Sequence, residues 1–388
     1  MKNVIVTGGR SPVTLDLVRL FAKKKYNVYI VESFKENLSG SSKYIRKNIV
    51  LPSPALETED FIQNLIDTII EYKIDLVVPT CEEVFYLAKY KTRIEKYCKL
   101  FAPDWDTLDQ LHSKYKFIEL LEKLDIDHPQ SKRLFNIESV NESINSADKF
   151  VLKPEYSRFA SYVIINNKNP EKINKVKISE DYPWVFQEYI KGQAYCSYSV
   201  AQEGKLLAHS VYSSIYCAGQ GATVHFESYQ SEAILKIVQK IVKELNYTGQ
   251  ISFDFIKSEK NGIYYPIECN PRATSGVYLF AENLIDSFFK SDKALADNFK
   301  IITPDPDKPK MVALAMLIYA LPALKSKSQL KTFIKKFYHA DDVIFKINDP
   351  KPFLSQFKGL AHYARIAKKK KITILEASTL DIEWNGNK

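Results

Sequence analysis

Short apolar runs and amphipathic stretches alternate over the first part of the chain. The runs are rich in β-branched residues, which is typical of buried parallel strands, and the stretches between them repeat apolar positions at helical spacing. Strands are predicted at residues 2–6, 26–32 and 74–80, and helices around residues 15–21 and 61–73. This alternation predicts an α/β fold with a doubly wound, Rossmann-like parallel sheet, which we assign to residues 1–103.

The pattern changes from residue 104 onward, where strands pair as hairpins. A helical pattern over residues 111–124 comes first, and a second amphipathic helix is predicted from residue 232. Strands are predicted at residues 149–155, 184–192, 195–214 (a hairpin), 250–256 and 263–270. We expect a two-lobed α+β domain over residues 104–300, with lobe A near residues 118–182 and lobe B near residues 183–300.

Residues 301–388 are predicted to form a C-terminal α/β extension. They combine an apolar segment, a basic helix near residues 328–338 and a closing strand at residues 371–378. The longest apolar run, residues 311–324, contains Pro322 and is too short to span a bilayer. We therefore expect no membrane among the partners of this chain.

Composition narrows the class of protein. With 45% hydrophobic and 26% charged residues, the chain is typical of a soluble globular protein and not of a disordered or fibrous one. The five cysteines form no CxxC pair, which favours reduced thiols and a cytoplasmic location. The net charge of +9 favours polyphosphate substrates, but no nucleic-acid-binding motif accompanies it, so we expect no nucleic acid as a partner.

The candidate chemistry begins where the strand at residues 263–270 ends. Glu268 and Asn270 are two positions apart, so both side chains project from the same face of that strand, with Cys269 on the other. A carboxylate beside an amide oxygen suits a magnesium ion that also binds phosphate oxygens. Arg272, just beyond, supplies a planar cation for a further anion.

Three more residues extend this pattern. Asp254 lies on the neighbouring antiparallel strand, from which it can reach the same metal ion as Glu268. Lys153 lies within an otherwise apolar strand, where a lysine is costly unless it reaches water or an anion, and we favour a phosphate. Lys114 lies on a predicted helix, where solvation is the common outcome for a lysine.

Two acidic sites in the first domain leave alternatives open. Gly8 and Gly9, with Glu32 at the end of the second strand, resemble part of a dinucleotide fingerprint, but the third glycine is absent. Glu82 and Glu83 follow the third strand, where one of them can face a ligand or both can begin a helix.

The order of these features resembles the ATP-grasp superfamily, in the branch of carbamoyl-phosphate synthase large subunits and biotin carboxylase. The resemblance covers roughly residues 1–300. It implies an N-terminal sheet before a two-lobed ATP-grasp domain, ATP with Mg²⁺ (or Mn²⁺) as cofactors, and the metal ligands Asp254, Glu268 and Asn270.

The resemblance also implies roles for other residues. Lys114 and Lys153 would contact phosphates, and Arg272, Lys153 and Arg158 would act in catalysis. The adenine would lie against the backbone of the strand before the interlobe turn, with Glu188 receiving the exocyclic amino group. The ATP-binding set is Lys114, Lys153, Gln187, Glu188, Tyr189, Ile190 and Gln193.

The chain departs from the family pattern at two places. Many relatives have an acid two residues after the hinge glycine, where this chain has Ala194, so Gln193, Ser197 or water must hold the ribose. Many also cover the phosphates with a glycine-rich loop, whereas residues 153–163 contain no glycine and leave Ser157, Arg158 and Ser161 for that task.

The function that this resemblance implies is an ATP-dependent carboxylate–amine ligase that activates a small-molecule carboxylate as an acyl phosphate. One alternative is a non-catalytic or regulatory ATP-binding relative, which the two departures permit. Another is a carbamoyl-phosphate-type kinase of a small acid. An NAD-linked oxidoreductase built on the first domain would leave the metal ligands without a role. A homodimer is an open alternative for the assembly.

Overall fold

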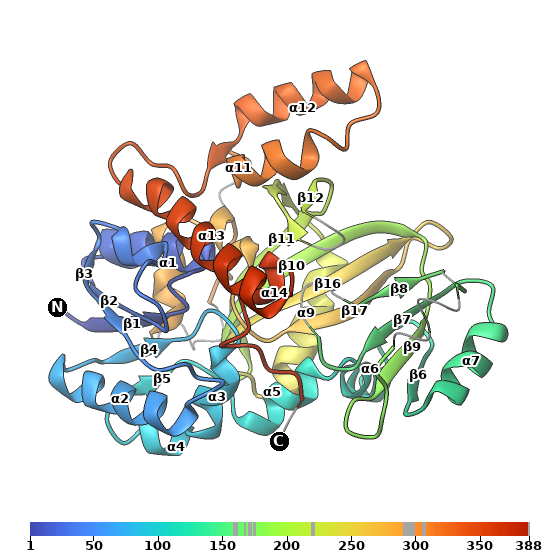
Figure 1. Cartoon of the computed structure of the whole chain (residues 1–388), viewed down its shortest axis with the longest axis horizontal. Helices are drawn as coiled ribbons and strands as arrows, with labels where there is room; N and C mark the ends of the chain where they lie inside the picture. The colour runs from blue at the N-terminus through green and yellow to red at the C-terminus, as the bar shows by residue number, and fades with distance from the viewer. Residues whose placement is uncertain are drawn as a thin grey trace.

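The computed structural model describes residues 1–157, 162–166, 168–169, 173, 176–218, 222–289, 299–304 and 308–386. Figure 1 shows the N-terminal sheet, the two sheets that follow it, and a set of C-terminal helices. No helix in this described part of the chain is long and apolar enough to cross a membrane.

The N-terminal sheet has five parallel strands in the order β3-β2-β1-β4-β5, which confirms the predicted doubly wound class. Its strands are β1 (Asn3–Thr7), β2 (Asn27–Glu32), β3 (Ile45–Val50), β4 (Leu76–Val78) and β5 (Lys99–Leu100). Its helices are α1 (Pro12–Lys23), η1 (Ser39–Ser41), α2 (Thr58–Glu71), α3 (Glu83–Lys89) and α4 (Lys91–Ile94). Residues of α1 share one core with Val4 and Val6, while residues of α2 and α3 share another with Ile5 and Val77, so helices cover both faces.

The second sheet has the order β6-β9-β7-β8, with antiparallel neighbours, and adds β9, from the range predicted for lobe B, to three strands of lobe A. Its elements are β6 (Ser131–Leu134), α7 (Ile137–Asn145), β7 (Phe150–Pro154), β8 (Ile164–Ile165) and β9 (Trp184–Glu188). Val140 and Ile144 of α7 share a core with Phe150 and Leu152, so α7 covers one face of this sheet and leaves the other face toward the rest of the molecule.

The third sheet, in lobe B, has the order β15-β11-β10-β16-β17. Its strands are β10 (Gly192–Gln202), β11 (Lys205–Ser213), β15 (Ser228–Tyr229), β16 (Gly249–Ser258) and β17 (Tyr264–Asn270). Around it lie α5 (Trp105–His112), α6 (Lys114–Lys123), α9 (Glu232–Glu244), η2 (Ser275–Leu279) and η3 (Glu282–Phe288). Phe117 and Ile118 of α6 pack in one core with Ile234 and Val238 of α9, so both helices cover the same sheet.

The C-terminal extension is mainly helical. It contains α11 (Ala313–Ala315), η4 (Met316–Ala320), α12 (Lys327–His339), α13 (Lys351–Lys370) and α14 (Ile374–Ala377). Its short strands β18 (Lys310–Met311) and β19 (Asp341–Asp342) pair with each other, and β18 also pairs with β14 (His225–Phe226). Two other short strands, β12 (Cys217–Ala218) and β13 (Ala222–Thr223), form a separate pair.

The closing strand predicted at residues 371–378 is wrong, because this segment contains the helix α14. Thr373 accepts a hydrogen bond from the Glu376 backbone N–H, and the Glu376 carboxylate accepts one from the Thr373 backbone N–H. This reciprocal capping begins a helix despite the β-branched residues that suggested a strand. The basic helix predicted near residues 328–338 is confirmed as α12.

Candidate active site

The strands β16 and β17 place three oxygen-bearing side chains together. Asp254 lies directly opposite Glu268 in the antiparallel register, and Asn270 lies on the same face two residues along. The Asn270 Nδ2 donates a hydrogen bond to Asp254 Oδ2 at 3.2 Å. Cys269 points the other way, into the core of lobe B. The alternation expected from the sequence is therefore present.

Two buried lysines approach this carboxylate pair from separate elements. Lys153 on β7 donates from Nζ to Gln187 Oε1 at 3.0 Å and to the Ile267 carbonyl at 3.1 Å. Lys114 donates to the Ser157 carbonyl at 3.1 Å, and its Nζ lies 3.6 Å from Glu268 Oε1. Both lysines therefore reach the end of β17 from lobe A and α6.

The burial of Lys114 follows from a helix break that the sequence pattern did not predict. The pattern over residues 111–124 predicted one helix, but the structure has α5 and α6 with Ser113 between them. The Ser113 side chain accepts a hydrogen bond from the Lys116 backbone N–H and so caps α6. Lys114 thus begins a new helix with its side chain only 3% exposed, instead of lying on a solvated helix face.

The charges of these groups depend on one another. Burial, followed by repulsion from the Glu268 carboxylate, raises the pKa of Asp254 to about 6. Burial alone would raise the pKa of Glu268 as well, but the ammonium groups of Lys114 and Lys153 outweigh it and the pKa is lowered. Burial lowers the pKa of Lys153 to about 8, although Glu268 opposes this shift.

Arg272 lies two residues beyond the end of β17, next to Asn270. Its Nη2 donates to Asn270 Oδ1 at 3.0 Å, and its Nε lies 3.8 Å from Glu82 Oε1. Glu82 is buried, and its Oε2 accepts a hydrogen bond from the Trp384 backbone N–H at 3.2 Å. The N-terminal sheet and the C-terminal tail therefore both contribute to the surroundings of Arg272.

The two neighbouring acids of the N-terminal domain have different surroundings. Glu83 Oε1 accepts hydrogen bonds from the Thr7 hydroxyl and from the backbone N–H groups of Thr80 and Cys81. Glu83 thus holds the turn that begins α3, while Glu82 faces Arg272. Only Glu83 has the helix-start role that the sequence allowed for both acids, and a ligand contact of Glu82 stays a prediction.

Sequence reasoning missed three residues near this site. Cys196 on β10 lies opposite Asp254 on the side away from Glu268. His112 Nε2 lies 3.2 Å from the carbonyl of Trp384, whose ring packs near Phe85 and Trp105. Trp384 is far from the site in sequence, and its large aromatic side chain was the one signal that it is packed.

Asp254 of β16, together with Glu268 and Asn270 at the end of β17, fits a magnesium ion. Among the residues that the structure describes, no group of three or more His, Cys, Asp or Glu side chains could hold a metal by itself. Asp254 and Glu268 provide two carboxylates, and Asn270 adds an amide oxygen that has a second lone pair besides the one directed at Arg272. Magnesium is commonly held by one or two carboxylates plus phosphate oxygens and water, which matches this donor set.

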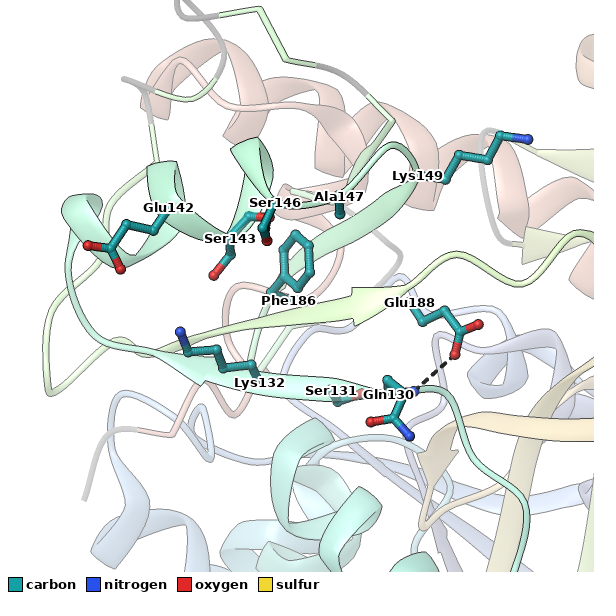
Figure 2. A pocket seen from close by; sticks show the side chains of 10 residues that line it. All are labelled: Gln130, Ser131, Lys132, Glu142, Ser143, Ser146, Ala147, Lys149, Phe186 and Glu188. Atoms are coloured by element: carbon teal, nitrogen blue, oxygen red, sulfur yellow. Dashed lines mark hydrogen bonds between the residues drawn. The ribbon is translucent and has the colours of Figure 1, made fainter.

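The strand that we expect to contact adenine is β9, and its side chains alternate between the two faces of the sheet. Gln187 faces Lys153, whereas Glu188 projects from the opposite face with Phe186, toward α7. Figure 2 shows Glu188 at the edge of a cavity of about 510 Å³ lined by residues of β6, α7 and β9, where its carboxylate accepts a hydrogen bond from the Gln130 backbone N–H. The side chain of Glu188 is thus not on the face of the sheet that holds Lys153.

The turn after this strand brings two backbones close together. A Cβ atom at Gly192 would lie 1.9 Å from the Lys257 carbonyl oxygen, so only glycine fits there. Tyr189 and Ile190 are half-buried in the connection, and Gln193 is exposed at the start of β10. Arg158 and Ser161 lie outside the described residues.

Glu32, whose sequence position resembles that of the ribose-binding acid in a dinucleotide fingerprint, has a structural role. Both carboxylate oxygens of Glu32 accept hydrogen bonds from the Arg10 side chain, which also pairs with Asp381 of the C-terminal tail. Glu32 is 4% exposed and is held inside this network, so its carboxylate joins the first domain to the tail.

Comparison with known proteins defines the class. Residues 111–276 match the ATP-grasp domain model, so this part of the chain is similar to ATP-grasp domains. The large chain of the mitochondrial arginine-specific carbamoyl phosphate synthase of Schizosaccharomyces pombe is 29% identical over 195 residues, which cover 45% of this chain and 17% of that protein. This chain therefore spans less than a fifth of the length of that relative.

Solved structures extend the likeness to the fold of most of the chain. The L-amino acid ligase from Bacillus licheniformis superposes with a TM-score of 0.59 at 15% identity, covering 80% of this chain and 78% of the ligase. The biotin carboxylase domain of the Hydrogenobacter thermophilus 2-oxoglutarate carboxylase, solved with MgADP and bicarbonate, has a TM-score of 0.58 at 15% identity, covering 73% and 66%. At such identities the likeness shows the fold alone.

Proposed function

We propose that this chain is an ATP-dependent ligase that joins a small-molecule carboxylate to an amine. The observation that carries the proposal is the convergence of Asp254, Glu268 and Asn270 with two buried lysines and Arg272. The same fold in an L-amino acid ligase and in a biotin carboxylase solved with MgADP supports it. We also propose the domain limits 1–103, 104–300 and 301–388, which contain the matched residues 111–276 within the middle unit.

The proposed reaction has two steps. A carboxylate oxygen attacks the γ-phosphorus of ATP and ADP leaves, and the amine nitrogen then attacks the acyl carbon while phosphate leaves. Phosphoryl transfer asks the protein chiefly for positioning and charge neutralisation. A magnesium ion, when bound at Asp254, Glu268 and Asn270, would supply positive charge to the phosphate oxygens.

The chain's own residues would provide the remaining charge. Lys114 and Lys153 would hold phosphate oxygens, because both are buried with their ammonium groups directed at the metal end. Arg272 would hold the substrate carboxylate, and Glu82 would orient the Arg272 guanidinium through their contact. No covalent enzyme nucleophile is required for either step.

The test is ADP release with Mg²⁺, measured across pooled carboxylates with and without pooled amines, for the wild type and for Glu268→Gln. We expect turnover that needs one acid and one amine and that is lost in Glu268→Gln. Turnover with an acid alone would indicate a kinase of a small acid instead. Tight ATP binding without turnover in any pool would favour the regulatory alternative, and equal turnover in the variant would overturn the assignment of the metal end.

A further inference from the structure

The α12 hairpin, which we define as residues 313–339, extends away from the sheets that form the candidate active site. In Figure 1 its two arms, α11 with η4 and then α12, lie at the top of the molecule, beyond the short strands β12 and β13. Phe333 of α12 packs against Met316 and Ala320 of η4 in a small core. The hairpin therefore has a packed inner face, and the outer face of α12 is open to solvent.

The hairpin carries positively charged side chains and no negatively charged ones. Residues 308–340 contain seven lysines, no arginine and no acidic residue. Lys310 pairs with Asp341 and Lys336 pairs with Glu227. Among the described residues, Lys327, Lys331 and Lys335 form no ion pair, and all three are exposed along one side of α12.

An apolar ridge runs beside these lysines. Leu330, Ile334 and Tyr338 recur at i, i+4 and i+8, so they form one stripe on α12. They are 40%, 46% and 86% exposed. The apolar face of α12 is thus wider than the part that the protein itself covers, and its open edge adjoins the lysine side.

We propose that the α12 hairpin docks the protein on an anionic lipid surface, with the ridge in the headgroup region and the lysines at the lipid phosphates. Basic amphipathic helices bind such surfaces through buried apolar area together with electrostatic attraction. The expectation that membranes are not partners rested on the lack of a bilayer-spanning run, which does not bear on a helix lying in the interface. This proposal is independent of the ligase activity.

A second copy of the chain, another protein or a nucleic acid would fit the exposed face of α12 less well than a lipid surface. In a two-fold symmetric dimer the same patch meets itself, so the lysines of two copies would repel each other. Protein–protein interfaces are depleted in lysine and enriched in arginine, and this region has only lysine. A nucleic acid would pair with the lysines but would leave the ridge of Leu330, Ile334 and Tyr338 in water.

The test is co-sedimentation of the full chain with vesicles of phosphatidylcholine alone or mixed with phosphatidylglycerol. We expect binding to the mixed vesicles only, decreasing as salt increases. The triple variant Lys327→Gln, Lys331→Gln, Lys335→Gln should lower the partition coefficient by roughly 100-fold, from about 1 kcal/mol per lysine. Leu330→Ser with Ile334→Ser should lower it by roughly 10-fold with little change in salt dependence.

A matched control uses three exposed lysines on another helix. Lys236→Gln, Lys240→Gln, Lys243→Gln on α9 removes the same charge and should leave vesicle binding unchanged. Thermal unfolding of each variant checks that the fold is intact. The proposal is overturned if the wild type does not bind the mixed vesicles, or if both triple variants lose binding equally. A concentration-dependent dimer that Ile334→Asp abolishes would also overturn it, by assigning the ridge to a second copy of the chain.

Discussion

The candidate site has two regions, which are built in different ways. The metal end contains Asp254, Glu268 and Asn270, and the base end is the strand β9 with the turn that follows it, where we expect the adenine base. At the metal end, Asp254 and Glu268 are directly paired across two neighbouring strands, and buried lysines reach them from other elements. At the base end, Glu188 is exposed on the α7 face of lobe A, and Gln193 donates a hydrogen bond to the carbonyl of its neighbour Ala194. Side chains therefore build the first region, and we propose that backbone groups would hold the base in the second.

This difference in construction predicts which contacts would contribute most of the free energy of ATP binding. Buried charges in a site with little water act strongly on phosphate and metal, so single substitutions there should be severe. A base held by backbone groups is recognised mostly by atoms that every residue carries, so substitutions there should be mild. The variants below test this contrast, beginning with the largest expected effect.

The largest loss is expected for Glu268→Gln and Asp254→Asn. Each change keeps the shape of the side chain but removes a negative charge from the proposed metal site, so the rate of ADP formation should fall by roughly 1000-fold. Steady-state kinetics over a range of Mg²⁺ concentrations measures this loss. Cys269→Ala, on the same strand but facing the core, is the control and should retain activity. A wild-type rate in Glu268→Gln would remove the basis for the contrast.

A loss of roughly 100-fold in kcat/KM for ATP is expected for Lys153→Met, because a buried ammonium would no longer face the phosphates. The pKa of Lys153 is lowered to about 8, so its positive charge is lost as the pH rises through that value. In the wild type, kcat/KM for ATP should therefore fall above about pH 8.

Lys153→Arg separates charge from shape in the same experiment, since arginine stays protonated over this range. Its kcat/KM for ATP should be lower than that of the wild type at neutral pH but should lack the alkaline decline. An alkaline decline that persists in Lys153→Arg would assign the titration to another group.

A smaller, selective effect is expected for the pair Glu82→Gln and Glu83→Gln. Glu82→Gln removes the charged partner that orients Arg272, so the KM for the carboxylate substrate should rise by roughly tenfold while the KM for ATP stays the same. Glu83→Gln weakens a buried turn instead, and should lower the melting temperature without changing either KM. Equal changes in both KM values for Glu82→Gln would contradict the positioning role.

The same contrast explains how far the sequence could predict the structure. Strand periodicity places Glu268 and Asn270 on one face, and a short turn makes the neighbouring strand carrying Asp254 its partner, so the metal end follows from local rules. The burial of Lys114 depends on a cap at Ser113 that interrupts a continuous apolar pattern. The contact of Trp384 with Glu82 joins segments that are 302 residues apart in the sequence, and no local pattern encodes it.

The smallest effect is expected for Glu188→Ala at the base end. Its side chain lies on the α7 face of the sheet and its carboxylate accepts a hydrogen bond from the Gln130 backbone N–H, so the KM for ATP should change by no more than about twofold. Gln187→Ala is the matched variant on the opposite face, where it removes the hydrogen bond to Lys153 and should raise the KM by roughly fivefold. Steady-state kinetics over a range of ATP concentrations measures both. A tenfold or larger loss for Glu188→Ala would mean that this side chain receives the exocyclic amino group, and that lobe A rearranges when the nucleotide binds, because the present packing directs the carboxylate away from the lysine face.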